Sequence, residues 1–404
     1  MHIALLHYAA PPVVGGVERV MAEHARLMVE DGHAVTIVAG RGEAWDPRIA
    51  LRRVPRADSR HPEVVAVKAD LDRGTVPPAF GPLAGGLLED LRQAMAGVDV
   101  VVAHNVGSLH KNLPLTAGLA ELARGEGHPP IVLWHHDLAW TAARYQTELH
   151  PGWPWSLLRT PWADRHVVVS EARRRELAAL LGIEPADIHV VPNGIDAAEL
   201  LTLAPETTAL VARLGLAEAA PLLLLPARLT KRKNVELALA ALSVLRRRMP
   251  AAQLVVTGPL GPHNPANAPY LKHLLERREK LGVSGAAHLL AEVMPDPVSD
   301  RSMADLYRLA DALLLPSFEE GFGIPVLEAA LARRPVFAAD IPSLRELGGD
   351  DVAWFDPHGA PEALAELVAR RLEDDLAYRL AVRVRRAYAW PRIYRRHIAP
   401  VLGL

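Results

Sequence analysis

The stretch HIALLHYAAPPVVGGVERVMAEHARLMVEDGHAVTIVAG, residues 2–40, decides the fold. It begins with an apolar run at 2–8, passes through a breaker loop at 9–16 and continues with apolar residues at helical spacing over 17–32. A second apolar run follows at 33–40. This change from a continuous apolar run to helical spacing and back predicts a β-α-β unit with parallel strands.

The same alternation continues along the chain in two halves. It runs up to Gly194 and restarts after it, which predicts two α/β domains with parallel sheets, at 1–194 and 195–387. A lone amphipathic helix at 388–404 is expected to pack back onto the first domain. The further expected strands are 98–105, 129–136, 165–170 and 188–194 in the first domain, and 221–229, 252–261, 287–293, 312–317 and 335–340 in the second.

Composition excludes several classes of protein. The 404 residues carry a net charge of −2, from 45 Lys plus Arg against 47 Asp plus Glu, so no basic excess points to a nucleic-acid partner. The absence of cysteine excludes disulfides, thiolate metal sites and a cysteine nucleophile. No apolar run is long enough for a membrane span, and no basic region precedes the first apolar run. We therefore expect a cytoplasmic enzyme.

The segment PSFEEGFGIPVLEAALARR, residues 316–334, is the most informative for chemistry. The loop Gly321, Phe322, Gly323, Ile324 leads into a helix, and its glycines let a ligand approach the backbone at a helix start that suits a diphosphate. Glu320 could then accept hydrogen bonds from sugar hydroxyls, and Glu328 could accept them from a ribose. On spacing alone, a helix-capping Glu320 and a solvated Glu328 are equally good interpretations.

A second segment, PARLTKRKNVELAL at 226–239, places two cations at the carboxyl end of a strand. Arg228 follows the strand and Lys233 stands just before a helix, where the pair can neutralise a diphosphate without metal. Taken alone, a solvated basic turn is the better account, and Lys231 and Arg232 are assigned to that turn.

Two adjacent histidines end another strand, in WHHDLAW at 134–140. Neighbouring residues of a strand point to opposite faces, so only one of His135 and His136 can face a given site. Metal binding by this pair with Asp137 matches no common zinc spacing. A hydrogen bond from one histidine to a reacting sugar is the favoured interpretation, with a structural role for the other.

Two further segments complete the candidate set. Gly15 and Gly16 lie between the first strand and the first helix, where their amides could meet a diphosphate; the signal is weak because the dinucleotide fingerprint is incomplete. Polar residues at the end of the expected strand 98–105, in the loop that follows it, and in the segment ARYQTE at 143–148 are candidates for binding an acceptor, although a capped helix start with solvated side chains explains them better. These candidates are His104, Asn105, Lys111, Arg144 and Tyr145.

The motifs GGVERV, HHDL, VPNGID, ARLTKRKN and EEGFGIPVLEA, in this order, span essentially the whole chain. Together they resemble the retaining glycosyltransferases of family four, the large family that includes phosphatidylinositol mannosyltransferases and sucrose synthases. The resemblance implies the GT-B fold, in which two Rossmann-like domains face each other across a cleft and a C-terminal helix crosses back to the first domain. This sequence departs from the family pattern in one respect, which is the additional histidine His135.

The resemblance also implies roles for residues. Glu320 would contact the donor sugar, Glu328 the ribose, Arg228 and Lys233 the diphosphate, and His136 the region of the reactive carbon. The first domain would contribute Gly15 and Gly16 to the diphosphate, and the second would read the base with the backbone of Val293 and Met294. The implied roles for Gly321, Phe322, Gly323 and Ile324 are in donor binding.

We therefore predict a retaining, metal-independent glycosyltransferase that needs no cofactor and moves a mannosyl or glucosyl group. GDP-mannose and UDP-glucose are the main donor options, with a slight preference for mannose. The acceptor is a small molecule, a saccharide or a lipid-linked hydroxyl compound, and membrane contact is at most peripheral. A phosphorylase or nucleotide-sugar epimerase on the same scaffold, or a non-catalytic sugar-binding protein, are the alternatives.

Overall fold

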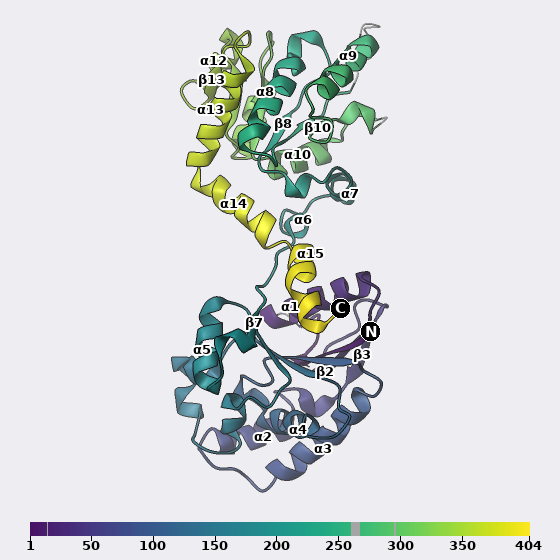
Figure 1. Ribbon diagram of the computed structural model, residues 1–404, viewed down its shortest axis with the longest axis vertical. Coiled ribbons are helices and arrows are strands. Elements are labelled where there is room, and N and C mark those ends of the chain that lie inside the picture. Colours follow the sequence, from purple (N-terminus) through teal and green to yellow (C-terminus); the bar gives the residue numbers. More distant parts are fainter. Residues whose placement is uncertain (14, 260–266, 295) are drawn as a thin grey trace. The chain divides into compact units, whose positions relative to one another are not determined.

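The computed structural model describes residues 1–13, 15–259, 267–294 and 296–404. The chain divides into two compact units (Figure 1). Unit 1 comprises Met1–Gly194 together with Trp390–Leu404, and unit 2 comprises Ile195–Ala389. Among the helices of the described residues, none has both the length and the apolar character needed to cross a membrane.

Unit 1 is built on a parallel sheet of seven strands in the order β3-β2-β1-β4-β5-β6-β7. The chain builds outward from β1 to β3 and then restarts on the other side with β4, so the strand order reverses between β1 and β4. Ligands of open α/β sheets bind at the carboxyl ends of strands beside such a reversal. The strands are β1 (His2–Ala9), β2 (Ala34–Arg41), β3 (Ile49–Arg53), β4 (Val100–His104), β5 (Ile131–His135), β6 (Arg165–Val168) and β7 (Ile188–Val190).

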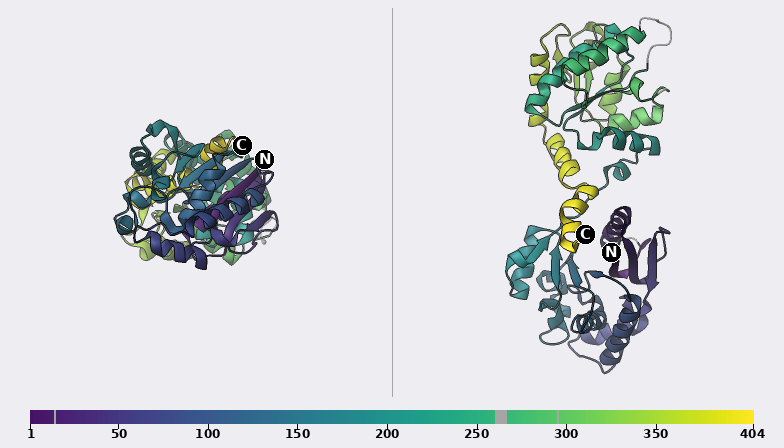
Figure 2. Two further views of the ribbon diagram at one scale, coloured as in Figure 1. Left: turned by 90° about the horizontal axis from the view of Figure 1, so that it is seen from below. Right: turned by 45° about the vertical axis from the view of Figure 1, so that its right-hand side comes forward.

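Helices cover both faces of this sheet (Figure 2). Alternate residues of β1 enter different cores: Ala4 and Leu6 pack with α2, α3 and α4, whereas Ile3 and Leu5 pack with α1 and the C-terminal segment. Burial of both faces explains why the strands are continuous apolar runs. The helices are α1 (Gly16–Glu30), α2 (Pro62–Leu71), α3 (Phe80–Ala94), α4 (Leu113–Leu122) and α5 (Glu171–Leu181).

The C-terminal segment packs on α1 within unit 1 (Figure 1). Tyr394 donates its hydroxyl hydrogen to Asp31 at 2.8 Å, and Arg165 donates to the carbonyl of Val401 at 2.6 Å. The segment is not the single helix expected from the sequence. It consists of α15 (Trp390–Ile393), a π-helical turn (Tyr394–Ile398) and α16 (Ala399–Leu402). Pro400 has no amide hydrogen to continue the regular ladder.

The segment also begins two residues later than the expected position 388. Ile195 forms a bridge with Ala389 and donates its amide hydrogen to the carbonyl of Tyr388 at 2.7 Å. These bonds tie residues 388 and 389 to the start of unit 2, and unit 1 resumes at Trp390.

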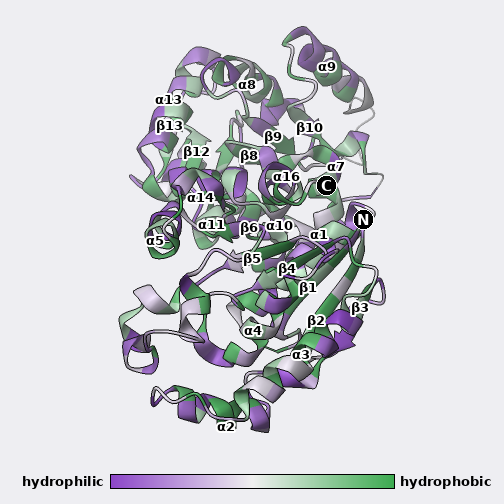
Figure 3. Cartoon of the chain, turned by 60° about the horizontal axis from the view of Figure 1, so that its bottom comes forward, coloured by the Kyte–Doolittle hydropathy of each residue, from purple (hydrophilic) through white to green (hydrophobic). Residues whose placement is uncertain are grey.

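Unit 2 is built on a parallel sheet of six strands in the order β10-β9-β8-β11-β12-β13, which reverses between β8 and β11. Leu222 and Leu224 enter one core and Leu223 and Leu225 the other, so β8 is buried on both faces. Figure 3 shows the hydrophobic colouring of the central strands in both units. The strands are β8 (Leu222–Leu225), β9 (Gln253–Val256), β10 (Ala287–Leu289), β11 (Ala312–Leu315), β12 (Val336–Ala339) and β13 (Ala353–Phe355).

The helices of unit 2 form two layers around this sheet. Their bounds are α6 (Ala197–Leu200), α7 (Pro205–Leu214), α8 (Val235–Arg248), α9 (Asn267–Lys280), α10 (Asp300–Leu309), α11 (Ile324–Leu331), α12 (Pro342–Gly348), α13 (Pro361–Asp374) and α14 (Leu376–Ala387). The expected strands match β8 to β12 but are too long, because loops that follow the strands are also apolar. The end of the expected strand and loop at 252–261 lies outside the described residues.

Candidate active site

In unit 2, the loops that follow β8 and β11 meet at the reversal of strand order. Phe318 donates its amide hydrogen to the carbonyl of Arg232 at 2.8 Å, which joins the two loops. Gly258, after β9, supports the first loop from the other side. A Cβ atom at Gly258 would lie 1.8 Å from the carbonyl oxygen of Ala227, so only glycine permits this approach. Gly258 was not among the residues predicted from the sequence, where its signal is a glycine just after a buried strand.

Lys233 and Glu320 form a buried ion pair at this meeting point. Lys233 Nζ lies 2.5 Å from Glu320 Oε1, and the two side chains are 11% and 8% exposed. Ser317 donates its hydroxyl hydrogen to the same carboxylate oxygen at 2.7 Å. Arg232, which the sequence analysis assigned to a solvated turn, also lies close: its guanidinium donates to the carbonyl of Glu319 and is 3.9 Å from Glu320 Oε2.

Arg228 lies on the same loop as Lys233 but is differently placed. Its side chain is exposed and has no hydrogen-bond or ion-pair partner among the described residues. A guanidinium without a carboxylate partner can bind an incoming anion without breaking an existing ion pair.

The loop before α11 depends on one of its two glycines. Gly323 has φ +105° and is buried, and a Cβ atom there would lie 2.5 Å from Leu344 Cδ2. Gly321 has open space around it. The start of α11 carries no side-chain cap, so Glu320 is not a helix cap. Pro325 has no amide hydrogen, and Val326 donates its own to the carbonyl of Gly323 at 2.9 Å. The amides of Gly323 and Ile324 are therefore the ones at this helix start that an anion can use.

Glu328 is an exposed residue of α11 with one specific partner. Tyr307 donates its hydroxyl hydrogen to Glu328 Oε2 at 2.6 Å. Burial, together with this carboxylate, raises the pKa of Tyr307. This hydrogen bond fixes the direction of the Glu328 carboxylate, whereas the carboxylate of a fully solvated glutamate would have no fixed direction.

The backbone at Val293 and Met294 offers acceptors rather than donors. Both amide hydrogens are used within their own turn, bonded to the carbonyl of Leu290 at 3.0 and 2.8 Å. Among the described residues, the carbonyl of Val293 accepts one long bond of 3.4 Å, from Arg213. A nucleotide base that binds to this backbone would therefore have to donate hydrogen bonds from its N–H groups.

In unit 1, three histidines lie at the carboxyl ends of the neighbouring strands β1, β4 and β5. His104 Nδ1 lies 3.1 Å from His136 Nε2. His7 Nδ1 lies 2.8 Å from the carbonyl oxygen of His104. Asn105, with φ +59°, accepts the amide hydrogens of His136 and Asp137 on its side-chain oxygen. These bonds fix both the backbone and the ring of His136.

His135 belongs to a separate buried pair. Its Nε2 lies 3.1 Å from His166 Nδ1, and it is 2% exposed. His136 is half-buried, so it is the one of the two adjacent histidines that a ligand can reach. Burial, with a smaller contribution from His7, lowers the pKa of His136 to about 3, which makes the ring neutral at pH 7.

Of the five candidate acceptor residues, Lys111 lines a cavity at this edge of the sheet. The cavity has a volume of about 410 Å³ and lies beside His7 and Glu18. His104 and Asn105 are 0% and 2% exposed and position His136 instead, so a direct acceptor contact does not fit them. Arg144 lies 3.8 Å from Asp137 and over the ring of Tyr145. The other lining residues are Tyr8, Ala9, Val13, Arg41, Ser59, Arg60 and Lys68.

Gly15 and Gly16 lie at the start of α1, without a side-chain cap. Gly16 has open space where a Cβ atom would point, whereas at Gly15 that position is within 2.1 Å of a Glu18 carboxylate oxygen. The same carboxylate is 3.9 Å from His7 Nε2. Glu18 would therefore have to turn away for an anion to approach Gly15.

The comparisons with known proteins cover both units. Residues 14–199 match the family model described as Glycosyltransferase Family 4, and residues 207–388 match the one described as Glycosyl transferases group 1. The chain belongs to glycosyltransferase family 4. Its two Rossmann-like units, one for each model, have the GT-B architecture that the sequence predicted.

Individual relatives of this family-4 chain carry different names. A D-inositol 3-phosphate glycosyltransferase of Kineococcus radiotolerans is 34% identical over 56% of this chain and 52% of its own length. The chain thus spans about half the length of that relative. An MMP alpha-(1->4)-mannosyltransferase of Mycolicibacterium hassiacum is 25% identical over 87% of this chain and 84% of its own. A solved structure of a glycosyltransferase from Rickettsia africae is 17% identical to this chain. The match covers 100% of this chain and 97% of that one, with a TM-score of 0.37.

One group of side chains in the family-4 chain has the composition of a metal site. Ligand atoms of Asp72, His110 and Glu148 lie within 4.8 Å of one another. Lys68 Nζ already bonds to both carboxylates, at 2.6 and 2.9 Å, and His110 Nε2 lies 2.6 Å from Glu148. An ammonium group bonded to both carboxylates does not fit a bound cation, so we assign no metal to these residues.

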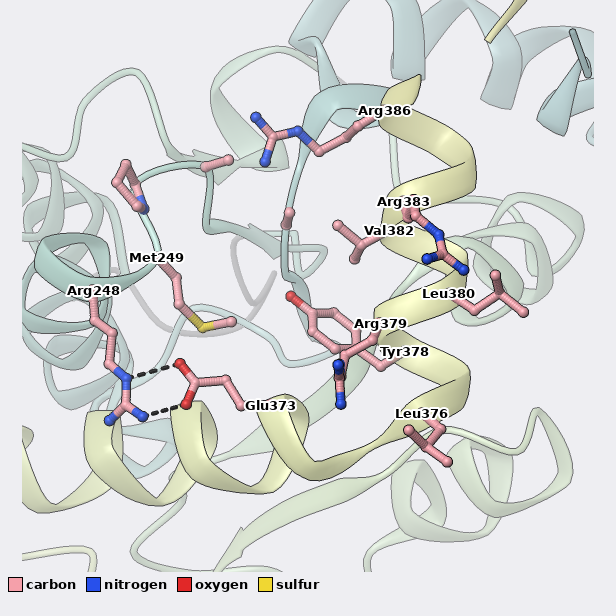
Figure 4. Close-up of a pocket in the computed structure, with 13 residues that line it drawn as sticks. Arg248, Met249, Glu373, Leu376, Tyr378, Arg379, Leu380, Val382, Arg383 and Arg386 are labelled. Atoms are coloured by element: carbon pink, nitrogen blue, oxygen red, sulfur yellow. Dashed lines mark hydrogen bonds and ion pairs between the residues drawn. The ribbon is translucent and has the colours of Figure 1, made fainter. Parts of the chain in front are cut away.

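A groove of about 690 Å³ in unit 2 lies between α14 and the end of α8 (Figure 4). The one carboxylate that lines it, on Glu373, is bonded to Arg248. None of its lining residues follows the carboxyl end of a strand. The groove is therefore separate from the candidate active site of this family-4 chain.

Proposed function

We propose that this protein transfers a hexosyl group from a nucleoside diphosphate sugar to a hydroxyl group of an acceptor, with retention of the anomeric configuration. The observation that carries the proposal is the Lys233–Glu320 pair with Arg228, at the reversal of strand order in a family-4 chain. It combines cations for a diphosphate with a carboxylate for sugar hydroxyls in one place.

The main requirement of this reaction is to hold charge on the departing diphosphate while the sugar gains oxocarbenium character. Arg228 and Lys233 supply two cations, and the start of α11 supplies backbone amides. Lys233 is bonded to Glu320, but an ammonium group has three donors and can hold a phosphate oxygen as well. No metal ion is needed for this step.

The remaining donor contacts follow from the same arrangement. The nearest cation to Glu320 Oε2 within the described part of the chain is Arg232, at 3.9 Å, so this oxygen can accept hydrogen bonds from sugar hydroxyls. Glu328 accepts from the ribose, and His136 donates to the sugar near its reactive carbon. The acceptor hydroxyl attacks from the face that the diphosphate leaves, and a donor phosphate oxygen takes its proton.

We further propose that the acceptor carries a phosphate or carboxylate group. Three observations support this. The unit 1 cavity is lined by Arg60 and Lys111, neither of which has a side-chain ion-pair partner among the described residues. Arg41 also lines the cavity, and its guanidinium lies 3.5 Å from the carboxylate of Asp58. One relative is named for an inositol phosphate.

The donor is proposed to be GDP-mannose, with UDP-glucose as the other option, because one relative that covers most of the chain is named a mannosyltransferase. The backbone carbonyls of Val293 and Met294 can accept hydrogen bonds from the N–H groups of both guanine and uracil, so they do not distinguish the two bases. A cytoplasmic location and at most peripheral membrane contact stay predictions.

The test is to incubate the protein with each donor, with and without acceptors such as inositol phosphates, and to measure nucleoside diphosphate release. Proton NMR of the product then gives its anomeric configuration. We expect acceptor-dependent release that is lost in Arg228→Ala and retained in Lys231→Ala, an exposed cation of the same turn. No release with any donor, or an inverted product, would contradict the proposal.

A further inference from the structure

The hydrogen bond between His104 and His136 contains a single proton, and its position determines what His136 can do. Both rings are neutral at pH 7, because burial lowers the pKa of each, to about 3 for His136. A neutral imidazole has one N–H and one bare nitrogen. The proton between His104 Nδ1 and His136 Nε2 therefore belongs to one ring, and this choice fixes the tautomers of both.

The two arrangements differ in what they leave buried. If His136 Nε2 donates, the proton of His104 must sit on its Nε2, which is buried without any partner among the described residues. If His104 Nδ1 donates instead, the same buried atom is only an unused acceptor. Buried donors without a partner are rarer in proteins than buried acceptors without one, so the second arrangement is favoured.

The surroundings of His104 keep it from changing this arrangement. It is 0% exposed, its backbone carbonyl accepts from His7 Nδ1 at 2.8 Å, and its ring packs beside His24 and Trp134. The rings of His104 and His136 are tilted by only 25°, which suits a bond in the ring planes. The side-chain oxygen of Asn105 accepts the backbone amide hydrogen of His136 at 2.8 Å, so both the backbone and the ring of His136 are held.

We propose that His104 is a positioning residue that holds His136 as the Nδ1–H tautomer, so that its one accessible ring nitrogen is a hydrogen-bond donor and not a base. His136 Nδ1 has no partner among the described residues and is not among their buried unpaired atoms, so a ligand can reach it. The role in transfer rests on the proposed function: the donor would be directed at a sugar hydroxyl or a phosphate oxygen. The tautomer itself does not depend on that function.

Long-range ¹⁵N–¹H correlation spectra of the histidine-labelled protein at pH 7 test the tautomer directly. His7 is an internal reference, because its Nδ1 faces a carbonyl oxygen and must carry hydrogen. The signals of His136 are assigned by their loss in His136→Gln. We expect a protonated Nδ1 and a bare Nε2 in His136. A protonated Nε2 in the wild-type spectrum would overturn the proposal, whatever the variants do.

Two variants then separate positioning from packing. His104→Asn keeps an amide donor near the position of Nδ1, and we expect it to keep the His136 tautomer and to retain transfer within a few-fold of the wild type. His104→Leu removes the donor that holds the proton of His136 on Nδ1, so the spectrum should show a mixture of the two tautomers in place of one, and kcat/KM should fall by about tenfold or more. An unchanged tautomer in a folded His104→Leu protein would contradict the positioning role. If transfer is absent in all forms but the tautomer is as expected, only the proposed function fails.

Discussion

Lys233 and Glu320 form an ion pair of 2.5 Å although they are 87 positions apart in the chain. Each follows a different strand, β8 or β11, and the loops are further joined by a backbone hydrogen bond between Phe318 and Arg232. The pair is buried, so each partner depends on the other for compensation of its charge.

Because of this dependence, the single and the double variant of the pair should differ in stability although both lose activity. Lys233→Met leaves the Glu320 carboxylate buried without its ammonium partner, and we expect it to reduce the free energy of unfolding by about 2 kcal/mol. The double variant Lys233→Met with Glu320→Gln should regain most of that loss, because the amide can still bond to Ser317. Transfer should be lost in both. Urea unfolding and nucleoside diphosphate release measure the two effects, and equal stability of the two variants would contradict the coupling.

Substitution of Arg228 should reduce activity without reducing stability. Its side chain is exposed without a partner among the described residues, so Arg228→Ala should change the free energy of unfolding by less than about 0.5 kcal/mol. Loss of one cation for the leaving diphosphate should lower kcat by about 100-fold. Lys231→Ala is the matched control, an exposed cation three residues away with no proposed role. Normal turnover of Arg228→Ala would contradict the diphosphate contact.

The two glycines before α11 give a third prediction. Gly323→Ala places a Cβ atom at φ +105° and 2.5 Å from Leu344, so we expect a loss of about 1–3 kcal/mol in stability. Gly321→Ala enters open space and should leave the unfolding free energy nearly unchanged. Thermal unfolding of both variants compares them directly. Equal melting temperatures would show that the loop can adapt.

The sequence predicted the fold well where strands are buried on both faces, as in β1 and β8, because continuous apolar runs follow from that burial. It did not predict the edge strands β3 and β13: in β3 only Ile49 is buried, so no apolar run marks it. The segments α2, α3, α13 and α14 were also not predicted.

Within the candidate site, the residue types and their strand-end positions could be predicted, because parallel strands bring their carboxyl ends to one edge. The partners could not. That His135 bonds to His166 and His136 to His104 depends on which faces of β4, β5 and β6 meet, which no local pattern contains. The placement of Arg232 beside Glu320 likewise depends on the approach of a distant loop.

Buried neutral histidines should make the protein sensitive to acid. Burial lowers the pKa of His24 to about 3, and neither ring nitrogen has a partner among the described residues. Below pH 6.5 the unfolded chain binds a proton at this position that the folded chain does not, so stability falls with decreasing pH until the folded value is reached. At pH 5 this single group costs about 2 kcal/mol relative to neutral pH.

His24→Leu removes this titration and the two unpaired nitrogens, and it leaves an apolar side chain beside Trp134 and Trp390. We expect the variant to be more stable than the wild type at pH 5, with a smaller advantage at pH 7.5, because the proton-linked term is absent there. The measurement is urea unfolding of both proteins at the two pH values. His189→Leu is the control, since His189 is an exposed histidine of the edge strand β7. A stability difference between His24→Leu and the wild type that does not change with pH would show that His24 is already protonated in the fold or hydrogen-bonded to water.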